Sequence, residues 1–461
     1  MSSVSSSSKP LYLPCLLDPN RPVRSLSIVF WLWKALVLII IISCPGLGYD
    51  TSSSLFPPQG NGSDVSLAIP LKFVRWDSIY FINIAQRGYV FEQEWAFSYT
   101  YGSIVNFLSS FLFRSDDSNG AANLAVTAVV LSHVAHYFSV LVVYRLSINV
   151  FGDDTERRKL FCFLSAALHI FSPAGAFLSA PYGEPVFSFL NITGFYIYSS
   201  SRLGSATGNH PLSYGKLVLA GCLFAVATAI RSNGLLSGVL LAYDALEQFC
   251  DVVFRRSMNA GIRLCVVIFS GCIVAFGFVI PQYFAYAAYC TADGISRPWC
   301  QSLVPSIYGW VQDRYWGVGF LRYWTVSNIP LFLLALPMLL ILFLSCSWAL
   351  SADLSLLSPN DSPKSGPILS LSPASPLLTQ LAIAQFILTA MAFTSYHVQI
   401  INRVSSGYPL WYWYLVWHAL GISEDAQSKV KYKTRSLAIV QVMVVYALVQ
   451  ATLFGSFLPP A

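Results

Sequence analysis

Long apolar stretches recur along the whole chain and are separated by short polar segments. A helix that crosses the hydrocarbon core of a bilayer needs about 20 mainly apolar residues, and its backbone hydrogen-bonds within itself. By this criterion we expect about eleven membrane-spanning helices, at residues 25–46, 121–146, 160–179, 185–201, 216–231, 232–250, 264–284, 330–350, 377–397, 409–422 and 436–457. The pattern therefore predicts an all-α, polytopic membrane protein in which residues 1–461 form a single multi-span domain.

The composition strengthens this prediction. Hydrophobic residues make up 55% of the 461 residues and charged residues only 10%, whereas a soluble protein is about 25% charged. So few charged side chains cannot coat a soluble protein of this length, and a disordered chain or a nucleic-acid binder is excluded on the same ground. The ten cysteines form no CxxC pair and no Cys/His cluster with zinc spacing, so we expect no metal site.

The distribution of basic residues sets the expected orientation. Cytosolic segments of membrane proteins carry an excess of Lys and Arg. With the N-terminus in the cytosol and eleven spans, 17 basic residues lie on the cytosolic side and 9 on the opposite side. Two long loops, 47–120 and 285–329, then face the lumen, and the Ser/Pro-rich stretch 351–376 is a cytosolic linker. We therefore expect any chemistry on the luminal side.

An amphipathic helix is predicted in the first of these loops. Apolar residues recur at helical spacing from Phe73 to Ile84, and Asp77 lies near the start of that helix. A carboxylate at the bilayer surface can meet a substrate whose head group is in water and whose tail is in lipid. Asp77 can equally be an ordinary first-turn residue favoured by the helix dipole, and spacing alone leaves both interpretations open. A second surface helix is expected at 101–113, which is apolar but too short to span.

More polar groups are expected at the same membrane face. Glu184 lies in a turn-prone link between two spans, and ionisable residues at membrane depth mostly face a cavity or a partner. Arg231, two residues before Asn233, ends one span; it can pair with a phosphate or simply extend to the interface. Arg403 lies in a polar luminal turn that loop polarity alone can explain.

The second long loop carries two cysteines and many aromatic residues. Nine residues separate Cys290 from Cys300, which suits a disulfide in an oxidising lumen. The aromatic side chains between Tyr308 and Trp324 suit either the water–lipid boundary or stacking against a sugar, and the sequence leaves both open. In the first loop, Asn61 begins an Asn-Gly-Ser acceptor for glycosylation.

Five segments carry a family likeness. The run Arg75-Trp-Asp-Ser-Ile-Tyr-Phe-Ile-Asn-Ile-Ala-Gln-Arg-Gly-Tyr89, with Glu92 and Phe97 after it, resembles the first luminal loop of the PIG-V-type mannosyltransferases, the GPI mannosyltransferase 2 family. Further matches are Ser179-Ala-Pro-Tyr-Gly-Glu184, Ala229-Ile-Arg-Ser-Asn-Gly234, Gln312-Asp-Arg-Tyr-Trp-Gly-Val-Gly-Phe-Leu-Arg-Tyr323 and His397-Val-Gln-Ile-Ile-Asn-Arg403. They come in the family's order and cover most of residues 70–415.

The resemblance implies a glycosyltransferase of the multi-span GT-C type in the endoplasmic-reticulum membrane, with a luminal active site. It implies transfer of mannose from dolichyl-phosphate mannose to the glycosylphosphatidylinositol (GPI) precursor, adding the second mannose through an α-1,6 bond. In this class an acidic residue of the first luminal loop is the catalytic base, and here that residue is Asp77. Substrate contacts are expected from Arg75, Trp76, Glu92, Glu184, Arg231, Asn233 and Arg403. The lipid-linked donor and acceptor are the expected partners, without a cofactor, and some family members are thought to act with a small accessory membrane subunit.

Three other functions remain open from the sequence. A transporter or lipid flippase would also explain the spans and the charges within them, but it should show internal repeats with paired broken helices. The two halves of this chain show no convincing repeat. A transferase that uses another dolichol-phosphate sugar is the alternative within the enzyme class, and a non-catalytic assembly subunit is the third.

Overall fold

Helices make up all the regular secondary structure in the described part of the chain. The computed structural model describes residues 17–45, 48–50, 52, 69–113, 120–206, 208–291, 297–357, 376–422 and 426–459. Asn61 and most of the 351–376 linker lie outside these ranges, so the glycosylation site and the linker stay predictions.

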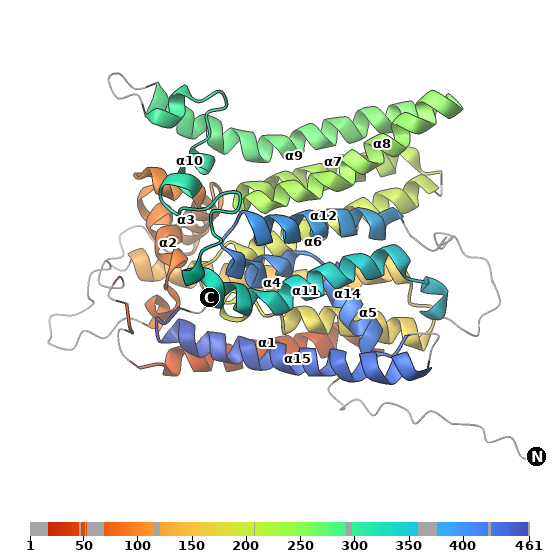
Figure 1. The fold of residues 1–461 in the computed structure, drawn as a ribbon, viewed down its shortest axis with the longest axis horizontal. Coiled ribbons are helices and arrows are strands. Elements are labelled where there is room, and N and C mark those ends of the chain that lie inside the picture. The colour runs from red at the N-terminus through yellow and green to blue at the C-terminus, as the bar shows by residue number, and fades with distance from the viewer. Residues whose placement is uncertain are drawn as a thin grey trace, which may run out of the picture.

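The body of the molecule is a bundle of long helices, most of which run side by side along its longest axis (Figure 1). In chain order these helices are α1 (Pro22–Ser43), α4 (Gly120–Phe151), α5 (Glu156–Ile170), α6 (Glu184–Ala206), α7 (His210–Ile230), α8 (Gly238–Arg255), α9 (Met258–Cys290), α11 (Ile329–Ser351), α12 (Pro376–Thr394), α14 (Leu410–Ala419) and α15 (Ala426–Gly455). They occupy the stretches in which the sequence predicts spans. α6 packs against both α4 and α7, α9 packs on α7 and α8, and α1 packs against α15.

Seven helices in the described part of the chain are long and apolar enough to cross a membrane. They are α1, α4, α7, α9, α11, α12 and α15. The other four fall short for two different reasons. α5 and α14 have only 15 and 10 residues. α6 and α8 are long enough but too polar, α6 through its Ser, Asn and Tyr side chains and α8 through charged residues such as Asp244. The predicted count of eleven spans is therefore not confirmed.

Two glycines allow α7 and α9 to pack closely. A Cβ at Gly277 would overlap the backbone carbonyl of Ala225, and one at Gly221 would lie 3.0 Å from Ser270. Small residues of this kind let helix backbones approach each other inside a membrane. The contact fixes the position of α9, whose C-terminal half lines the cavity described below.

A buried ion cluster joins α6, α8 and α9. The guanidinium of Arg263 donates to both carboxylate oxygens of Asp244, at 2.5 and 3.2 Å, and the Tyr198 hydroxyl donates to the same carboxylate at 3.3 Å. Arg202 lies 4.0 Å from this carboxylate and pairs with Glu247 at 3.0 Å. Asp244 is fully buried, and the Gln248 amide also donates to its carboxylate at 3.1 Å, so neighbouring side chains replace the water that would otherwise solvate its charge.

We expect Asp244→Ala to lower the free energy of unfolding by about 3–5 kcal/mol, because it leaves the Arg263 guanidinium buried without its carboxylate partner. The measurement is the thermal unfolding midpoint of the detergent-solubilised protein. Asp251→Ala is the matched control, since this α8 aspartate pairs with Arg255 at the surface and its side chain is 39% exposed. Equal midpoints for the two variants would contradict a stabilising role of the cluster.

Candidate active site

The two loops predicted to be luminal meet at one end of the bundle (Figure 1). α2 (Asp77–Arg87) and α3 (Tyr101–Leu112) belong to the first loop, and α10 (Ile307–Arg314) belongs to the second. α2 packs against α3, and α10 packs against the short helix η3 (Glu92–Ala96) of the first loop. Segments far apart in the sequence therefore form one layer over this end of the bundle.

A cavity of about 390 Å³ lies where this layer meets the ends of α7, α9 and α12. Small-molecule sites in proteins commonly have volumes of about 300–1,000 Å³. Four of the residues singled out from the sequence line the cavity, namely Asp77, Arg231, Asn233 and Arg403. The fold thus brings together polar groups that are as much as 326 residues apart in the chain.

Asp77 is the first residue of α2 and follows a turn with an unusual backbone conformation. Trp76, the residue before it, has φ of 56°, in the left-handed region that non-glycine residues rarely adopt. The C-terminal segment holds this turn, because the Trp76 indole N–H donates to the carbonyl of Leu458 at 3.2 Å and the ring meets the edge of Phe457. The strained turn places the Asp77 carboxylate in the cavity, where its side chain is 41% exposed.

Asp77 ends a chain of four alternating charges. Nη1 of Arg403 donates to Oδ2 of Asp77 at 3.1 Å, and Nε of Arg403 lies 3.7 Å from Oε1 of Glu184. The same Glu184 oxygen lies 2.7 Å from Nη1 of Arg231. Glu184 is fully buried and does not line the cavity, so it lies behind the two arginines and holds both by charge. In this order the residues run Arg231, Glu184, Arg403, Asp77.

Arg403 is held between aromatic rings as well as carboxylates. Its guanidinium carbon lies 4.5 Å from the ring centroid of Phe177 and 5.7 Å from that of Tyr182, within the range of cation–π attraction. Burial acts to lower the pKa of Arg403, but the carboxylates of Asp77 and Glu184 outweigh it and raise the pKa above its usual value. Arg403 therefore stays charged, and its position orients the Asp77 carboxylate.

The turn from Arg231 to Gly234 is rigid. The Asn233 side-chain amide donates to the Tyr408 hydroxyl at 3.3 Å, and that hydroxyl donates to the backbone carbonyl of Asn233 at 3.0 Å. The hydroxyl of Ser232 donates to the Tyr308 hydroxyl at 2.8 Å. A Cβ at Gly234 would lie 2.6 Å from the backbone nitrogen of Thr228, so only glycine fits there. The turn presents Arg231, whose side chain is 20% exposed, to the cavity.

Three other residues predicted to contact substrate lie outside the cavity lining. Arg75 is buried against the ring of Phe457, 4.7 Å from its centroid, and its carbonyl accepts a hydrogen bond from Tyr182. Trp76 packs on the same C-terminal segment. Glu92 joins the two surface loops, as described next. The structure thus places these three around the site rather than in it, and substrate contact by them stays a prediction.

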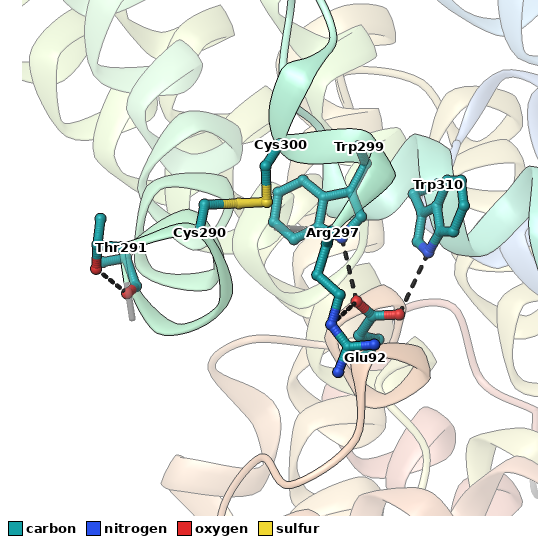
Figure 2. The surroundings of a disulfide bond; sticks show 8 residues. Glu92, Cys290, Thr291, Arg297, Trp299, Cys300 and Trp310 are labelled. Carbon is teal, nitrogen blue, oxygen red and sulfur yellow. Dashed lines mark hydrogen bonds and ion pairs between the residues drawn. A yellow bond between two sulfur atoms is a disulfide. The ribbon is translucent and has the colours of Figure 1, made fainter. Parts of the chain in front are cut away.

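Glu92 receives hydrogen bonds from three side chains of the second loop. Two of them are drawn in Figure 2: Oε1 accepts from the indole N–H of Trp299, at 3.2 Å, and Oε2 accepts from that of Trp310, at 3.3 Å. Oε2 also accepts from the Tyr315 hydroxyl at 3.1 Å. Nε of Arg297 lies 3.5 Å from Oε1. We call Glu92, Arg297, Trp299, Trp310 and Tyr315 the Glu92 cluster. It fastens the first loop to the second through one nearly buried carboxylate.

A disulfide joins Cys290 and Cys300 beside this cluster (Figure 2). It connects the C-terminal residue of α9 to the short helix η6 (Pro298–Gln301), which carries Trp299. Because a covalent bond limits how far this segment can move away from α9, it also limits how far Trp299 can move from Glu92. The cross-link therefore supports the Glu92 cluster.

The sequence of this chain matches known proteins over nearly its whole length. The family described as Mannosyltransferase (PIG-V) matches residues 26–461. The chain belongs to the PIG-V mannosyltransferase family. Among its relatives, the GPI mannosyltransferase 2 of Aspergillus oryzae is 52% identical over 97% of this chain and 98% of its own. The GPI mannosyltransferase 2 of Aspergillus fumigatus is also 52% identical, over 97% of this chain, and that of Yarrowia lipolytica is 31% identical over 95%.

Among solved structures, this PIG-V family chain is similar to the oligosaccharyltransferase of Archaeoglobus fulgidus. One structure, in complex with an inhibitory peptide and a dolichol-phosphate, aligns with a TM-score of 0.48 at 10% identity. It covers 93% of this chain, but this chain spans only 56% of the archaeal protein. A second structure, tethered to an acceptor peptide, aligns with a TM-score of 0.46 and 55% coverage of that protein.

The cavity of this PIG-V family member also contains residues outside the predicted catalytic and substrate-binding set, although Tyr308 and Trp316 belong to the aromatic run for which the sequence left stacking against a sugar open. They are aromatic or amide side chains from several elements, namely Tyr80, Phe97, Gln282, Tyr308, Gln312, Trp316, Tyr396 and His397. Tyr80 was detectable in principle, because it follows Asp77 by three residues on the same helix. The others depend on which loops meet. No group of three or more His, Cys, Asp or Glu side chains suited to a metal ion occurs in the described part of the chain.

His397 is the titratable imidazole of the cavity lining. Its ring lies between those of Tyr323, 4.9 Å away, and Trp316, 6.2 Å away. Burial lowers the pKa of His397 below its usual value; the charge of Asp77 opposes this effect and that of Arg403 adds to it. His397 is therefore neutral at neutral pH, and the fixed positive charges of the cavity lining are the two arginines.

Proposed function

We propose that this chain transfers mannose from dolichyl-phosphate mannose to the singly mannosylated GPI precursor, adding the second mannose through an α-1,6 bond. The relatives named GPI mannosyltransferase 2 support this proposal at up to 52% identity over almost the full chain. The single observation that carries it is the ion-pair chain from Arg231 through Glu184 and Arg403 to Asp77 at the edge of a cavity. It supplies one partly exposed carboxylate and one partly exposed guanidinium to the same space.

In the proposed reaction Asp77 is the general base. The acceptor hydroxyl loses its proton to the Asp77 carboxylate while its oxygen forms a bond to the anomeric carbon of the donor mannose. The bond between that carbon and the phosphate oxygen breaks, and its electron pair leaves with dolichyl phosphate. Attack on the face opposite the phosphate converts the β-linked donor into an α-linked product. Arg403 holds the base in place throughout by its hydrogen bond to Asp77.

The two arginines have different roles in this proposal. Arg403 is occupied by Asp77 on one side and Glu184 on the other. The ion pair of Arg231 is with the buried Glu184, and part of its guanidinium faces the cavity. We therefore assign the donor phosphate to Arg231, which stabilises the charge that develops as the phosphate leaves, often a large term in catalysis. Glu184 balances both arginines and has no direct contact with substrate.

The membrane arrangement is part of the same proposal. Donor and acceptor are both lipids, so a cavity at the end of a helix bundle can hold their head groups together at the bilayer surface. We infer that α5, α6, α8 and α14 also lie in the membrane, the short helices α5 and α14 crossing it together with the residues that flank them, which gives eleven spans of the GT-C type. The cavity then opens on the luminal side of the endoplasmic reticulum, in agreement with the excess of basic residues on the other side. An accessory membrane subunit stays a prediction.

Complementation of cells that lack the second GPI mannosyltransferase tests the proposed function. We expect this chain to restore surface GPI-anchored proteins and to remove the accumulated precursor that carries one mannose. The measurement is lipid chromatography of mannose-labelled GPI intermediates. Persistence of the singly mannosylated precursor, with the chain present in the membrane, would contradict the proposal. It would favour a transferase that uses a different dolichol-linked sugar.

A further inference from the structure

Three aromatic side chains of the cavity lining contact one another in series, in the order Tyr80, Phe97, Trp316. The rings of Tyr80 and Phe97 are stacked, 4.5 Å apart and 14° from parallel. The Trp316 ring meets Phe97 edge to face at 5.3 Å. All three line the cavity and are partly exposed, and we call them the aromatic wall.

The aromatic wall lies next to the proposed catalytic base. Tyr80 follows Asp77 by three residues on α2, and residues at this spacing share one face of a helix. Both side chains line the cavity. A molecule that presents a hydroxyl group to Asp77 therefore brings its neighbouring atoms over Tyr80 and the rings beside it.

Other residues of the cavity lining have a different character. Gly277 and Phe278 come from α9, and Leu388 and Ala392 come from α12, two helices that are apolar enough to cross a membrane. The wall instead comes from α2 and from two surface segments, around Phe97 and Trp316. An isoprenoid chain suits the lining from α9 and α12, whereas a ring with both hydroxyl groups and an apolar face suits the aromatic wall.

The Glu92 cluster controls the position of the wall. Phe97 directly follows η3 (Glu92–Ala96), and Trp316 directly follows Tyr315, whose hydroxyl donates to Glu92. One carboxylate thus fixes both segments from which the wall projects. Disruption of the cluster would let Phe97 and Trp316 separate without removing any side chain from the cavity.

We propose that the aromatic wall is the subsite for the sugar of the acceptor glycolipid, and that Glu92 is its positioning residue. The proposal rests on the proposed function for the identity of the acceptor. The pyranose ring packs its C–H face on Phe97 and Trp316, which turns the accepting hydroxyl toward Asp77. Glu92 acts through the wall and does not touch the sugar.

The test is a kinetic comparison of full-length variants in membranes, with the singly mannosylated GPI precursor and dolichyl-phosphate mannose varied separately. We expect Trp316→Ala to raise the KM for the acceptor about 10-fold, because the substitution removes an aromatic contact and the apolar area that the contact buries. The KM for the donor should change less than about 2-fold. Trp316→Phe keeps a ring and should stay near the wild type. Phe320→Ala, in the same loop but 75% exposed and outside the cavity, is the matched control.

Glu92→Gln tests the positioning role. An amide offers one acceptor oxygen instead of two and points N–H groups at the donors of Trp310 and Tyr315, so the cluster loosens. We expect the KM for the acceptor to rise with little change in kcat. The double variant Glu92→Gln/Trp316→Ala should lose less than the two single variants combined, because Glu92 then positions only the Phe97 side of the wall.

Two outcomes would overturn the proposal. A rise in the KM for the donor rather than the acceptor would assign the wall to the lipid-linked donor, and additive losses in the double variant would separate Glu92 from the wall. Failure of the proposed function is seen independently, because wild-type chain would then leave the singly mannosylated precursor unconsumed.

Discussion

Asp77→Asn is expected to lower the rate of mannose transfer by about 10²–10⁴-fold, the usual contribution of a general base. Asparagine has nearly the shape of aspartate, but its amide cannot take up the proton of the acceptor hydroxyl. The fold should persist, because Asp77 is partly exposed and Arg403 keeps its second carboxylate, Glu184. The measurement is transfer from dolichyl-phosphate mannose in isolated membranes, normalised to the amount of protein.

The control for this variant is another carboxylate of the same layer. Asp313 pairs with Arg322 at the surface, half exposed and away from the cavity lining, and Asp313→Asn should leave transfer unchanged. Full activity of Asp77→Asn at normal abundance would remove Asp77 from the mechanism. The cavity would then need a different base, and His397 is the remaining neutral proton acceptor in its lining.

Arg231→Gln is expected to have the second largest effect. Loss of the guanidinium removes the positive charge that faces the departing phosphate, which should reduce kcat by about 10²–10³-fold. Arg231→Lys keeps the charge but loses the planar fork of the guanidinium, so its kcat should lie between those of the wild type and Arg231→Gln. The measurement is the transfer rate at saturating acceptor over a range of donor concentrations.

A structural explanation of this loss can be separated from a catalytic one. Arg231→Gln leaves the buried Glu184 without its closest partner, and this can lower stability on its own. The double variant Glu184→Gln/Arg231→Gln removes both charges and should recover thermal stability without recovering transfer. If transfer also recovers, Arg231 serves only to balance Glu184, and the donor phosphate must be bound elsewhere.

Much of the helix plan could be predicted from the sequence, because apolar content depends on the local chain alone. A helix lies at each of the predicted stretches, and α3 lies where the short surface helix is expected. The number of spans does not follow from composition alone, because it also depends on helix length and on charges within each helix. α14 consists almost entirely of apolar and aromatic residues but has only ten residues, and α8 has the length but carries Asp244 and Glu247.

The candidate site could be predicted only in its parts. Asp77, Arg231, Asn233 and Arg403 each stand out as polar groups at one predicted membrane face, and the structure groups them in one cavity. Their partners could not be predicted, since the contact between Asp77 and Arg403 depends on how distant segments pack. The hydrogen-bond partners of Glu92 could not be predicted for the same reason. Its sequence neighbourhood suits a substrate ligand, whereas its hydrogen bonds go to Trp299, Trp310 and Tyr315.

The dependence of the Asp77 turn on the C-terminal segment has a consequence for biosynthesis. Trp76 is held by Leu458, a residue that lies 382 positions later in the chain. At about 5–20 residues per second, synthesis of the intervening chain takes roughly 20–80 s. Throughout that interval the ribosome-bound chain already contains Asp77 but has no Leu458 to hold it. We therefore expect the Asp77 turn to reach its final conformation only after Leu458 has been synthesised, and a chain that stops before Phe457 to lack both contacts that hold Trp76.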